Sequence, residues 1–491
     1  MGSNPARTSI LIAAALAALT LAGVPTMSAA RAPAPAAASA PALGHWTNLS
    51  GTAGIESGTP AIWQDAKHRA YVLWLRTVGA SSFTYDVSTV AANGTPSAAV
   101  DVFSGGHWGA LSNEPTLLAQ SGKPLVVFDG IKGTTGSYAK GCIYGAAGTA
   151  QPWALQSWSL SNDCVNPVGS AGEDRSGTLA AAWGAGGNVL YRIGESPTIP
   201  APNPDSSIPL ASNGVPYKTG VVADTGGSNH FYVAWAQEFS NPASHDGYYV
   251  KDVTASGATM KAPGSSTDSI NRLGQFTNLA IAARIGHPGV YIAYCTGSTK
   301  CHPKLWRVGA AKAMSLPGST NPGAVSIAAG PGGRMWAAWF DESTTKVYVT
   351  RTNAAVSKLG SVRSYATPCF DHGLLGLSSG SSGRLDIALQ CRNKAKAQTQ
   401  DFITQVEVGL HVTASKTKVR NTTKQTITMT VTDAGDRVGG ATVRFAGHKG
   451  KTNSTGKISF TLARHTKPGT YSVVATKPQY TSGKTRVKVT R

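Results

Sequence analysis

The sequence predicts an all-β protein with two folded parts, and three observations support this. Residues 45–408 show almost no helical periodicity; a short apolar strand, a Gly-rich or polar turn and a second strand recur along them. Beyond about Leu410 shorter strand-like runs follow, several of them separated by Gly-containing turns. Six cysteines form three close pairs along the chain, a spacing typical of disulfides in an exported protein.

The first thirty residues have the pattern of an export signal. Arg7 provides a positive start, Ile10–Val24 is apolar, and Ser28–Ala30 offers small residues for cleavage. The apolar run is shorter than the roughly 20 residues that a spanning helix needs, so we predict a signal peptide over residues 1–30. A retained N-terminal anchor is the alternative. Residues 31–43 are predicted to be a Pro/Ala-rich linker, and no transmembrane segment is expected in the mature chain.

A strand–turn–strand unit recurs about every fifty residues, most clearly over Ala324–Trp339, which continues into Lys346–Arg351. Successive copies are 45 to 59 residues apart, measured between the residues that end the second strand. Six of these anchors are aromatic and the last is a leucine: Trp74, Phe128, Trp183, Trp235, Tyr294, Trp339 and Leu389.

A period near fifty residues with short strands is typical of β-propeller blades. One twisted four-stranded sheet cannot bury both faces alone, so blades pack radially and the anchors fill the space between them. We therefore predict a seven-bladed β-propeller over residues 44–408. His45–Ser50 precedes the first unit and the seventh unit is short, so we expect this segment to complete the seventh blade. A plain edge strand is the alternative.

Sequential pairing of the cysteines would place each disulfide inside one blade, the second, the fifth or the seventh. Zinc binding is the competing interpretation, but the sequence has no C-x-x-C and no histidines clustered at ligand spacing. The expected pairs are Cys142 with Cys164, Cys295 with Cys301, and Cys369 with Cys391.

The stretch Pro331–Trp339 resembles sialidase-like and BNR-type propellers. The resemblance implies a glycosidase in which three arginines hold a carboxylate, beside a Tyr/Glu nucleophile pair and an acid. This chain departs from the family pattern, because Tyr191–Gly194 has Gly where Phe/Tyr-Arg-Ile-Pro ends in Pro, and no Asp-box is present. We therefore carry over no catalytic residue and interpret Arg192 as a strand-end arginine.

Two other motifs are similar to catalytic or binding loops. Gly376–Gly380 matches Gly-x-Ser-x-Gly, and Gly447–Thr452 is similar to a phosphate-binding loop, but no helix is expected after either segment. Hydrolysis by two carboxylates stays open, since a propeller can gather acids from separate blades. The acids expected at blade turns are Asp129, Glu173, Asp174, Glu238, Asp341 and Glu342.

The chain from residue 409 to 491 is predicted to be a small antiparallel sandwich. Val431–Val443, Lys451–Phe460 and Gly469–Val474 resemble bacterial Ig-like and carboxypeptidase-regulatory-like modules. The resemblance implies a spacer or adhesive unit. Six strand-like runs are expected here: Leu410–Val419, Gln425–Asp433, Ala441–Ala446, Gly456–Leu462, Thr470–Thr476 and Thr485–Thr490.

The positive charge is concentrated in this last part. Residues 408–491 contain sixteen Lys and Arg but only two Asp and Glu, which gives +14 of the formal +20 of the chain. Such a concentration favours an anionic partner, for example a wall polymer, an acidic polysaccharide or a membrane surface. A solvated, charge-rich surface is the alternative. No nucleic-acid partner is expected, because no aromatic-interleaved basic patch is present.

Together these features predict a secreted, bacterial, non-enzymatic binding or adhesion protein, for which residues 408–491 offer an attachment to the cell wall. A diverged sialidase-like or other carbohydrate-active hydrolase is the alternative. No cofactor and no metal site are expected.

Overall fold

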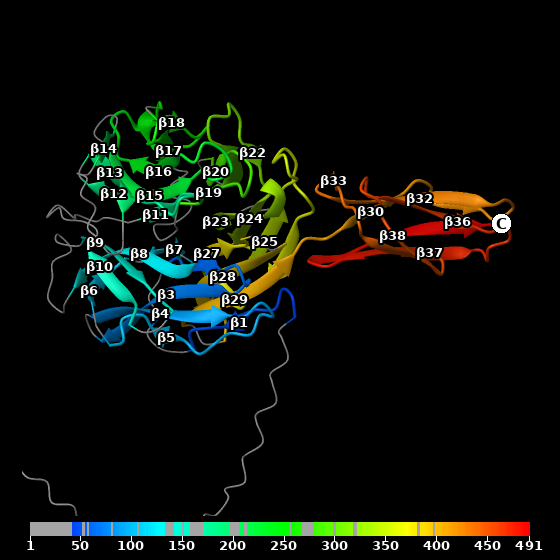
Figure 1. Ribbon diagram of the computed structural model, residues 1–491, viewed down its shortest axis with the longest axis horizontal. Coiled ribbons are helices and arrows are strands. Elements are labelled where there is room, and N and C mark those ends of the chain that lie inside the picture. The colour runs from blue at the N-terminus through cyan, green and yellow to red at the C-terminus, as the bar shows by residue number, and fades with distance from the viewer. Residues whose placement is uncertain are drawn as a thin grey trace, which may run out of the picture. The chain divides into compact units, whose positions relative to one another are not determined.

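The computed structural model describes residues 42–491 except 52–54, 56–57, 80–81, 106–107, 113, 121, 133–141, 150–151, 158–169, 186, 196–205, 211–213, 256, 268–278, 298–300, 318–321, 381–382 and 396–397. The expected signal peptide and most of the expected linker lie outside these residues. The all-β class is confirmed, since the described chain is built of antiparallel sheets, with the short 3-10 helices Ala243–His245 and Pro331–Gly333 between strands (Figure 1). None of the described helices has the length and apolar character needed to cross a membrane.

Described residues up to Glu407 form one nine-stranded sheet and five four-stranded sheets. The nine-stranded sheet has the order β10-β9-β8-β6-β4-β3-β2, with β5 on β4 and β7 on β8. Its strands are β2 (Ala61–Gln64), β3 (Ala70–Gly79), β4 (Ser82–Val90), β5 (Val100–Asp101), β6 (Trp108–Leu111), β7 (Thr116–Gln120), β8 (Lys123–Lys132), β9 (Cys142–Ala147) and β10 (Ala154–Ser157).

Four of the four-stranded sheets are simple meanders in chain order. The first two consist of β11 (Ser170–Glu173), β12 (Leu179–Ala185), β13 (Asn188–Glu195) and β14 (Ser206–Pro209), and of β15 (Val215–Ala223), β16 (Phe231–Glu238), β17 (Gly247–Asp252) and β18 (Met260–Lys261). The next two consist of β19 (Ile281–Ala283), β20 (Val290–Thr296), β21 (His302–Arg307) and β22 (Met314–Ser315), and of β23 (Pro322–Ala329), β24 (Met335–Asp341), β25 (Lys346–Arg351) and β26 (Arg363–Ala366).

The fifth four-stranded sheet joins the two ends of this part of the chain. It contains β27 (Cys369–Ser378), β28 (Arg384–Asn393) and β29 (Thr399–Glu407), and β1 (Thr47–Asn48) pairs with β29 at its edge. The main chain adds bonds on either side of β1, from the Gly44 N–H to the Gln405 carbonyl and from the Leu49 N–H to the Asp401 carbonyl. A strand from the start of the described chain therefore completes the last sheet.

Hydrophobic clusters connect each sheet to the next, and the last to the first. Leu125 and Val127 pack with Trp183 of the following sheet, for example. Trp74 packs with Ala388 and Ile403 of the sheet that β1 completes. The sheets thus form a closed ring, with β7, β11, β15, β19, β23 and β27 on its inner side (Figure 1). Dividing the nine-stranded sheet at β6 gives seven four-stranded units; the count of seven blades depends on that division and stays a prediction.

The seven anchor residues lie on the second strand of each unit, namely β3, β8, β12, β16, β20, β24 and β28. Each anchor is at most 1% exposed. Two of the tryptophans stack on a tyrosine of the third strand: Trp235 on Tyr249, with ring centroids 5.6 Å apart, and Trp339 on Tyr348, 5.9 Å apart. Burial of aromatic area between sheets is the main packing contribution expected from such residues.

Two disulfides lie inside single sheets. Cys295 on β20 bonds with Cys301, and Cys369 on β27 bonds with Cys391 on β28. Cys164 is outside the described residues, and so is the expected pair that it would form with Cys142.

The C-terminal part is a sandwich of two sheets around a core that includes Ile427, Met429, Val443, Val473 and Val487. A four-stranded sheet contains β30 (His411–Ala414), β32 (Gln425–Asp433), β33 (Asp436–Arg437) and β36 (Lys457–Leu462). The five-stranded sheet, in the order β31-β38-β37-β34-β35, contains β31 (Lys418–Arg420), β34 (Thr442–Phe445), β35 (His448–Lys451), β37 (Gly469–Lys477) and β38 (Tyr480–Thr490).

The expected single run Leu410–Val419 is wrong as one strand. The chain makes β30 in one sheet, leaves it over Ser415–Thr417, and makes β31 in the other sheet, parallel to β38. Val412 and Val419 are both buried in the same core, one from each sheet. An apolar pattern alone indicates that both residues point inward, but it does not indicate that the chain changes from one sheet to the other.

Candidate functional site

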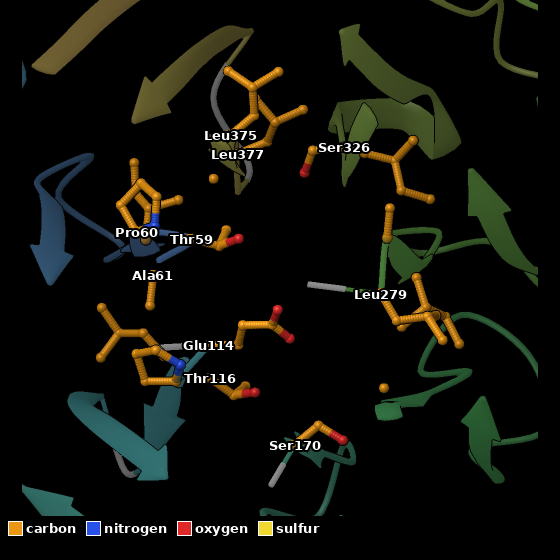
Figure 2. Close-up of a pocket in the computed structure, with 18 of the residues that line it drawn as sticks. Thr59, Pro60, Ala61, Glu114, Thr116, Ser170, Leu279, Ser326, Leu375 and Leu377 are labelled. Atoms are coloured by element: carbon orange, nitrogen blue, oxygen red, sulfur yellow. The ribbon is translucent and has the colours of Figure 1, made fainter. Parts of the chain in front are cut away.

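A cavity of about 190 Å³ lies among the inner strands of the ring (Figure 2). Residues of β2, β7, β11, β15, β19, β23 and β27, or residues directly before these strands, line it, so seven strands meet at one space. A second cavity, of about 400 Å³, is lined by later residues of the same strands. Leu117, Val221 and Ile327 line both cavities, which are therefore consecutive parts of one channel.

The first cavity combines an apolar wall with hydroxyl groups and one carboxylate. Its apolar lining includes Ile62, Leu279 and Leu377, and its hydroxyl-bearing residues are Thr59, Thr116, Ser170, Thr219 and Ser326. The Ser170 hydroxyl donates to Thr219 Oγ1 at 3.0 Å, and Thr219 donates to the Ala182 carbonyl at 3.2 Å. An apolar pocket with a few convergent polar groups is the usual form of a small-ligand site.

Glu114 is the carboxylate of this cavity. It immediately precedes Pro115 and β7, and its side chain points toward the middle of the space (Figure 2). The residue is only 5% exposed, and its Oε2 atom has no hydrogen-bond partner among the described residues. Burial raises the pKa of Glu114, and the charge of Lys218 acts in the opposite direction. Glu114 can thus offer its Oε2 atom to a ligand in the cavity.

Lys218 and Glu238 extend this arrangement away from the cavity. Lys218, on β15, is 2% exposed, and Glu238, at the end of β16, is 4% exposed. Burial lowers the pKa of Lys218, while Glu114 and Glu238 act to raise it. Burial and the charge of Asp246 raise the pKa of Glu238, and Lys218 opposes this. Glu114, which precedes β7, and Glu238, at the end of β16, are therefore both close enough to Lys218 for their charges to affect its pKa.

Neither Glu114 nor Lys218 was predicted as a site residue from the sequence. The one local signal for Glu114 is its position before a proline at the start of an apolar strand, where the first unit has Thr59 before Pro60. An acid at such a position is typical of a turn at the protein surface. Nothing in the local sequence indicates that Lys218 lies near Glu114, because the closed ring brings the two strands together.

The six acids predicted from the sequence lie at several separate places. Glu173 lines the second cavity, and Glu238 belongs to the group around Lys218. Asp174 accepts hydrogen bonds in its own turn from Ser176 and Thr178, and Asp341 accepts them from Ser343 and Thr344. Asp129 is part of neither described lining, and Glu342 pairs with His372 Nδ1 at 2.9 Å. The structure gathers no pair of these six acids in either cavity lining.

The arginines that the sialidase resemblance implies are not among the described residues that line either cavity. Arg192 is in the middle of β13 and only 4% exposed, so its interpretation as a strand-end arginine is wrong. It pairs in register with Ala181 of β12, and strand β13 continues for three residues beyond it. Among the residues that the structure describes, no group of three or more His, Cys, Asp or Glu could hold a metal ion.

Both loop motifs occur in β-hairpins. Gly376–Gly380 covers the end of β27 and the turn toward β28, and Gly447–Thr452 covers the turn after β34 and strand β35. Gly376 has a packing reason of its own, because a Cβ there would approach the Pro60 carbonyl oxygen to 2.2 Å. The glycine thus allows the last inner strand to pass close to the first.

Both acids of the C-terminal sandwich are engaged by arginines of the ring. Arg351 Nη2 lies 2.5 Å from Asp433 Oδ2, and Arg334 Nη2 lies 2.5 Å from Asp436 Oδ2. The Ala354 N–H also donates to Asp436 Oδ2 at 2.7 Å. Because the sixteen Lys and Arg of residues 408–491 have no other acid in that part of the chain, its remaining surface is cationic.

The chain matches neither a protein-family profile nor a curated protein sequence. Among solved structures it is similar to a fungal alcohol oxidase of the AA5 family in complex with copper, at 14% identity and a TM-score of 0.44, over 92% of this chain and 100% of that one. It is also similar to the polysaccharide lyase Uly1, at 10% identity and a TM-score of 0.44, over 72% and 90% of the chains. A third similar structure is an exo-β-1,3-galactanase from Phanerochaete chrysosporium, at 11% identity and a TM-score of 0.38, over 90% and 99%. With every TM-score below 0.5, we draw neither activity nor family from these similarities.

Proposed function

We propose that this is a secreted, non-enzymatic binding protein that its C-terminal sandwich attaches to an anionic polymer outside the cell. The observation that carries the proposal is the engagement of Asp433 and Asp436 by Arg351 and Arg334. These contacts use all the negative side-chain charge of residues 408–491 inside the molecule, while the Lys and Arg of the sandwich stay at its surface. A surface of one sign attracts a polymer of the other sign.

The ring then presents its channel to a second, small ligand. The first cavity is lined by hydroxyls, apolar side chains and a single carboxyl, a combination suited to a neutral, polar molecule such as the end of a carbohydrate. In this division of roles the sandwich holds the protein in place and the ring recognises a ligand there. The seven-blade ring and the domain limits 44–408 and 409–491 are part of this proposal.

Salt dependence tests the attachment. The intact mature protein is sedimented with bacterial cell walls and, in parallel, with beads of uncharged dextran, between about 0.05 M and 0.5 M NaCl. We expect retention on walls at low salt, loss of most of it at high salt, and no retention on dextran. Retention on walls that does not change with salt, or no retention at any salt, would contradict the proposal.

A carbohydrate-active hydrolase is the second candidate, and Glu114 is the observation that favours it. A buried carboxyl whose pKa is raised can act as a general acid, and Glu238, whose charge also acts on Lys218, is a candidate for the second carboxylate. Release of reducing sugar from a panel of polysaccharides by the wild type, and its loss in Glu114→Gln, would establish this function. No release from any member of the panel would exclude it for those substrates.

A further inference from the structure

We propose that the outer face of the five-stranded sheet of the sandwich binds a linear polymer of phosphodiesters lying along strand β38. The proposal rests on the proposed attachment to an anionic polymer and assigns the surface and the chemistry. On β38, Val487 and Val489 are buried in the core, whereas Lys484, Arg486 and Lys488 are exposed on the opposite side. The alternation of a strand thus gives one row of three cations.

The neighbouring strands add cations to the same face. Register pairs Lys488 with Lys418 on β31, and Arg444 on β34 with Lys449 on β35. The exposed cations of this face are Lys418, Arg420, Arg444, Lys449, Lys451, Lys484, Arg486 and Lys488. Both acids of the sandwich belong to the other sheet, on β32 and β33.

Like charges directly opposite each other on a sheet are destabilising. Arg444 opposite Lys449 and Lys418 opposite Lys488 are two such pairs, and none of these four side chains has an ion-pair partner within the described chain. Their repulsion is relieved when an anion lies between them. The face is therefore better suited to being occupied by negative charge than to being bare.

The spacing of the cations favours a chain with regularly repeated charges. Outward residues on one strand are separated by about 7 Å, and neighbouring strands by about 5 Å. A polyol-phosphate chain, with one phosphodiester per short repeat, can place one charge near each cation of β38. Beside it, Arg444, His448, Lys449 and Ser472 line a hollow of about 460 Å³ at the β34–β35 hairpin, where further phosphate oxygens can be bound.

The groups between the cations favour phosphodiesters over a polymer of acidic sugars. On β34 and β37 the outward residues of the face include Thr442, Thr470, Ser472 and Thr476, whose hydroxyls can donate to phosphate oxygens. The aromatic residues Phe445 and Tyr471 of these strands pack in the core, so the outward rows of β34 and β37 offer charge and hydroxyls to a polymer that lies along them.

Two matched variants of the intact protein test the surface. The first removes the β38 row, Lys484→Gln/Arg486→Gln/Lys488→Gln. The control, Lys424→Gln/Lys457→Gln/Arg464→Gln, also removes two exposed lysines and one exposed arginine, but from outside the five-stranded sheet. Affinity for poly(glycerol phosphate) is measured at about 0.1 M NaCl, with polygalacturonate of equal charge as the second probe.

We expect the β38 variant to lose affinity for poly(glycerol phosphate) about tenfold and to show a smaller salt dependence, and the control to lose no more than about threefold. Both variants should unfold at or above the wild-type temperature, since like-charge repulsion is reduced. Equal losses in the two variants would overturn the proposed face while leaving attachment by diffuse charge intact. Equal or tighter binding of polygalacturonate would overturn the phosphodiester assignment. Failure of the wild type to bind cell walls or either polymer would overturn the proposed attachment itself.

Discussion

Arg351 and Asp433 form an ion pair of 2.5 Å in which the side chains are only 1% and 2% exposed. Arg351 ends β25 of the ring and Asp433 ends β32 of the sandwich. The guanidinium group also lies 5.0 Å from the Trp336 ring and 5.4 Å from the Tyr480 ring. The cation is thus enclosed by protein, and Asp433 provides its counter-charge.

Removal of Asp433 should therefore be costly. We expect Asp433→Asn to lower the free energy of unfolding by about 3–5 kcal/mol, because it leaves Arg351 buried without its counter-charge. Asp436→Asn should cost less, since the Asp436 side chain is 27% exposed. Urea unfolding of both variants, with Arg351→Met/Asp433→Leu to complete the comparison, measures the effect. If the double variant loses more stability than Asp433→Asn, the ion pair with Arg351 does not explain the contribution of Asp433 to stability.

The anchor Trp339 provides a test of the packing between sheets. It is completely buried and stacks on Tyr348, and its Nε1 has no hydrogen-bond partner among the described residues. Trp339→Ala should lower the free energy of unfolding by about 3–5 kcal/mol, whereas Trp339→Phe should cost clearly less, because it keeps a ring and removes no hydrogen bond. Phe239→Ala, at a position 72% exposed, is the control. Similar losses for Trp339→Phe and Trp339→Ala would contradict this account of the anchor.

Stability should fall as the pH rises from about 4 to about 8. Burial raises the pKa of Asp129 to about 8, and burial also raises the pKa of Asp401 to about 8 against the hydrogen bond from Gln390. Between an unfolded-state pKa of about 4 and this folded-state pKa, the folded protein holds protons that the unfolded chain has released. The stabilisation is complete below about pH 4 and decreases by about 1.4 kcal/mol per pH unit for each carboxyl until about pH 8.

Asp401→Asn isolates one of these carboxyls, because the amide imitates the protonated acid. Urea unfolding at about pH 5 and about pH 8 should show a smaller difference in stability for the variant than for the wild type. Asp174→Asn, in a hydrogen-bonded surface turn, serves as a control, because this variant keeps the decrease of stability between about pH 5 and about pH 8 that Asp401 causes. An unchanged slope in Asp401→Asn would mean that Asp401 is ionised in the folded protein.

The two described disulfides should stabilise the protein to different extents. Cys295–Cys301 closes a loop with a sequence separation of 6, and Cys369–Cys391 one with a separation of 22. In the chain-entropy account the longer loop contributes about 1 kcal/mol more. Cys369→Ser/Cys391→Ser should thus lower the free energy of unfolding more than Cys295→Ser/Cys301→Ser, as measured in urea. The reverse order would point to packing around the sulfurs as the larger contribution.

The all-β class could be predicted because strand alternation and repeated anchors such as Trp235 and Trp339 are local patterns. Each anchor is buried for a reason that its own repeat contains, namely an apolar strand between two turns. The site is different. Glu114 and Lys218 belong to different sheets, and their proximity depends on how the ring closes, which no local pattern records. The prediction of a single strand over Leu410–Val419 was wrong for the same reason. The apolar pattern indicates which residues are buried, but it does not indicate which strand each residue pairs with.

The pairing of β1 with β29 also sets an order of events for the nascent chain. Thr47 and Asn48 are made first, but their partners Ile403 and Phe402 follow only when the whole ring has been synthesised. A chain interrupted before that point has a final sheet without its edge, and its first strand has nothing to pair with. Strand β1 therefore depends on β29, the last strand of the ring to leave the ribosome. The ring can close only when synthesis has passed residue 407.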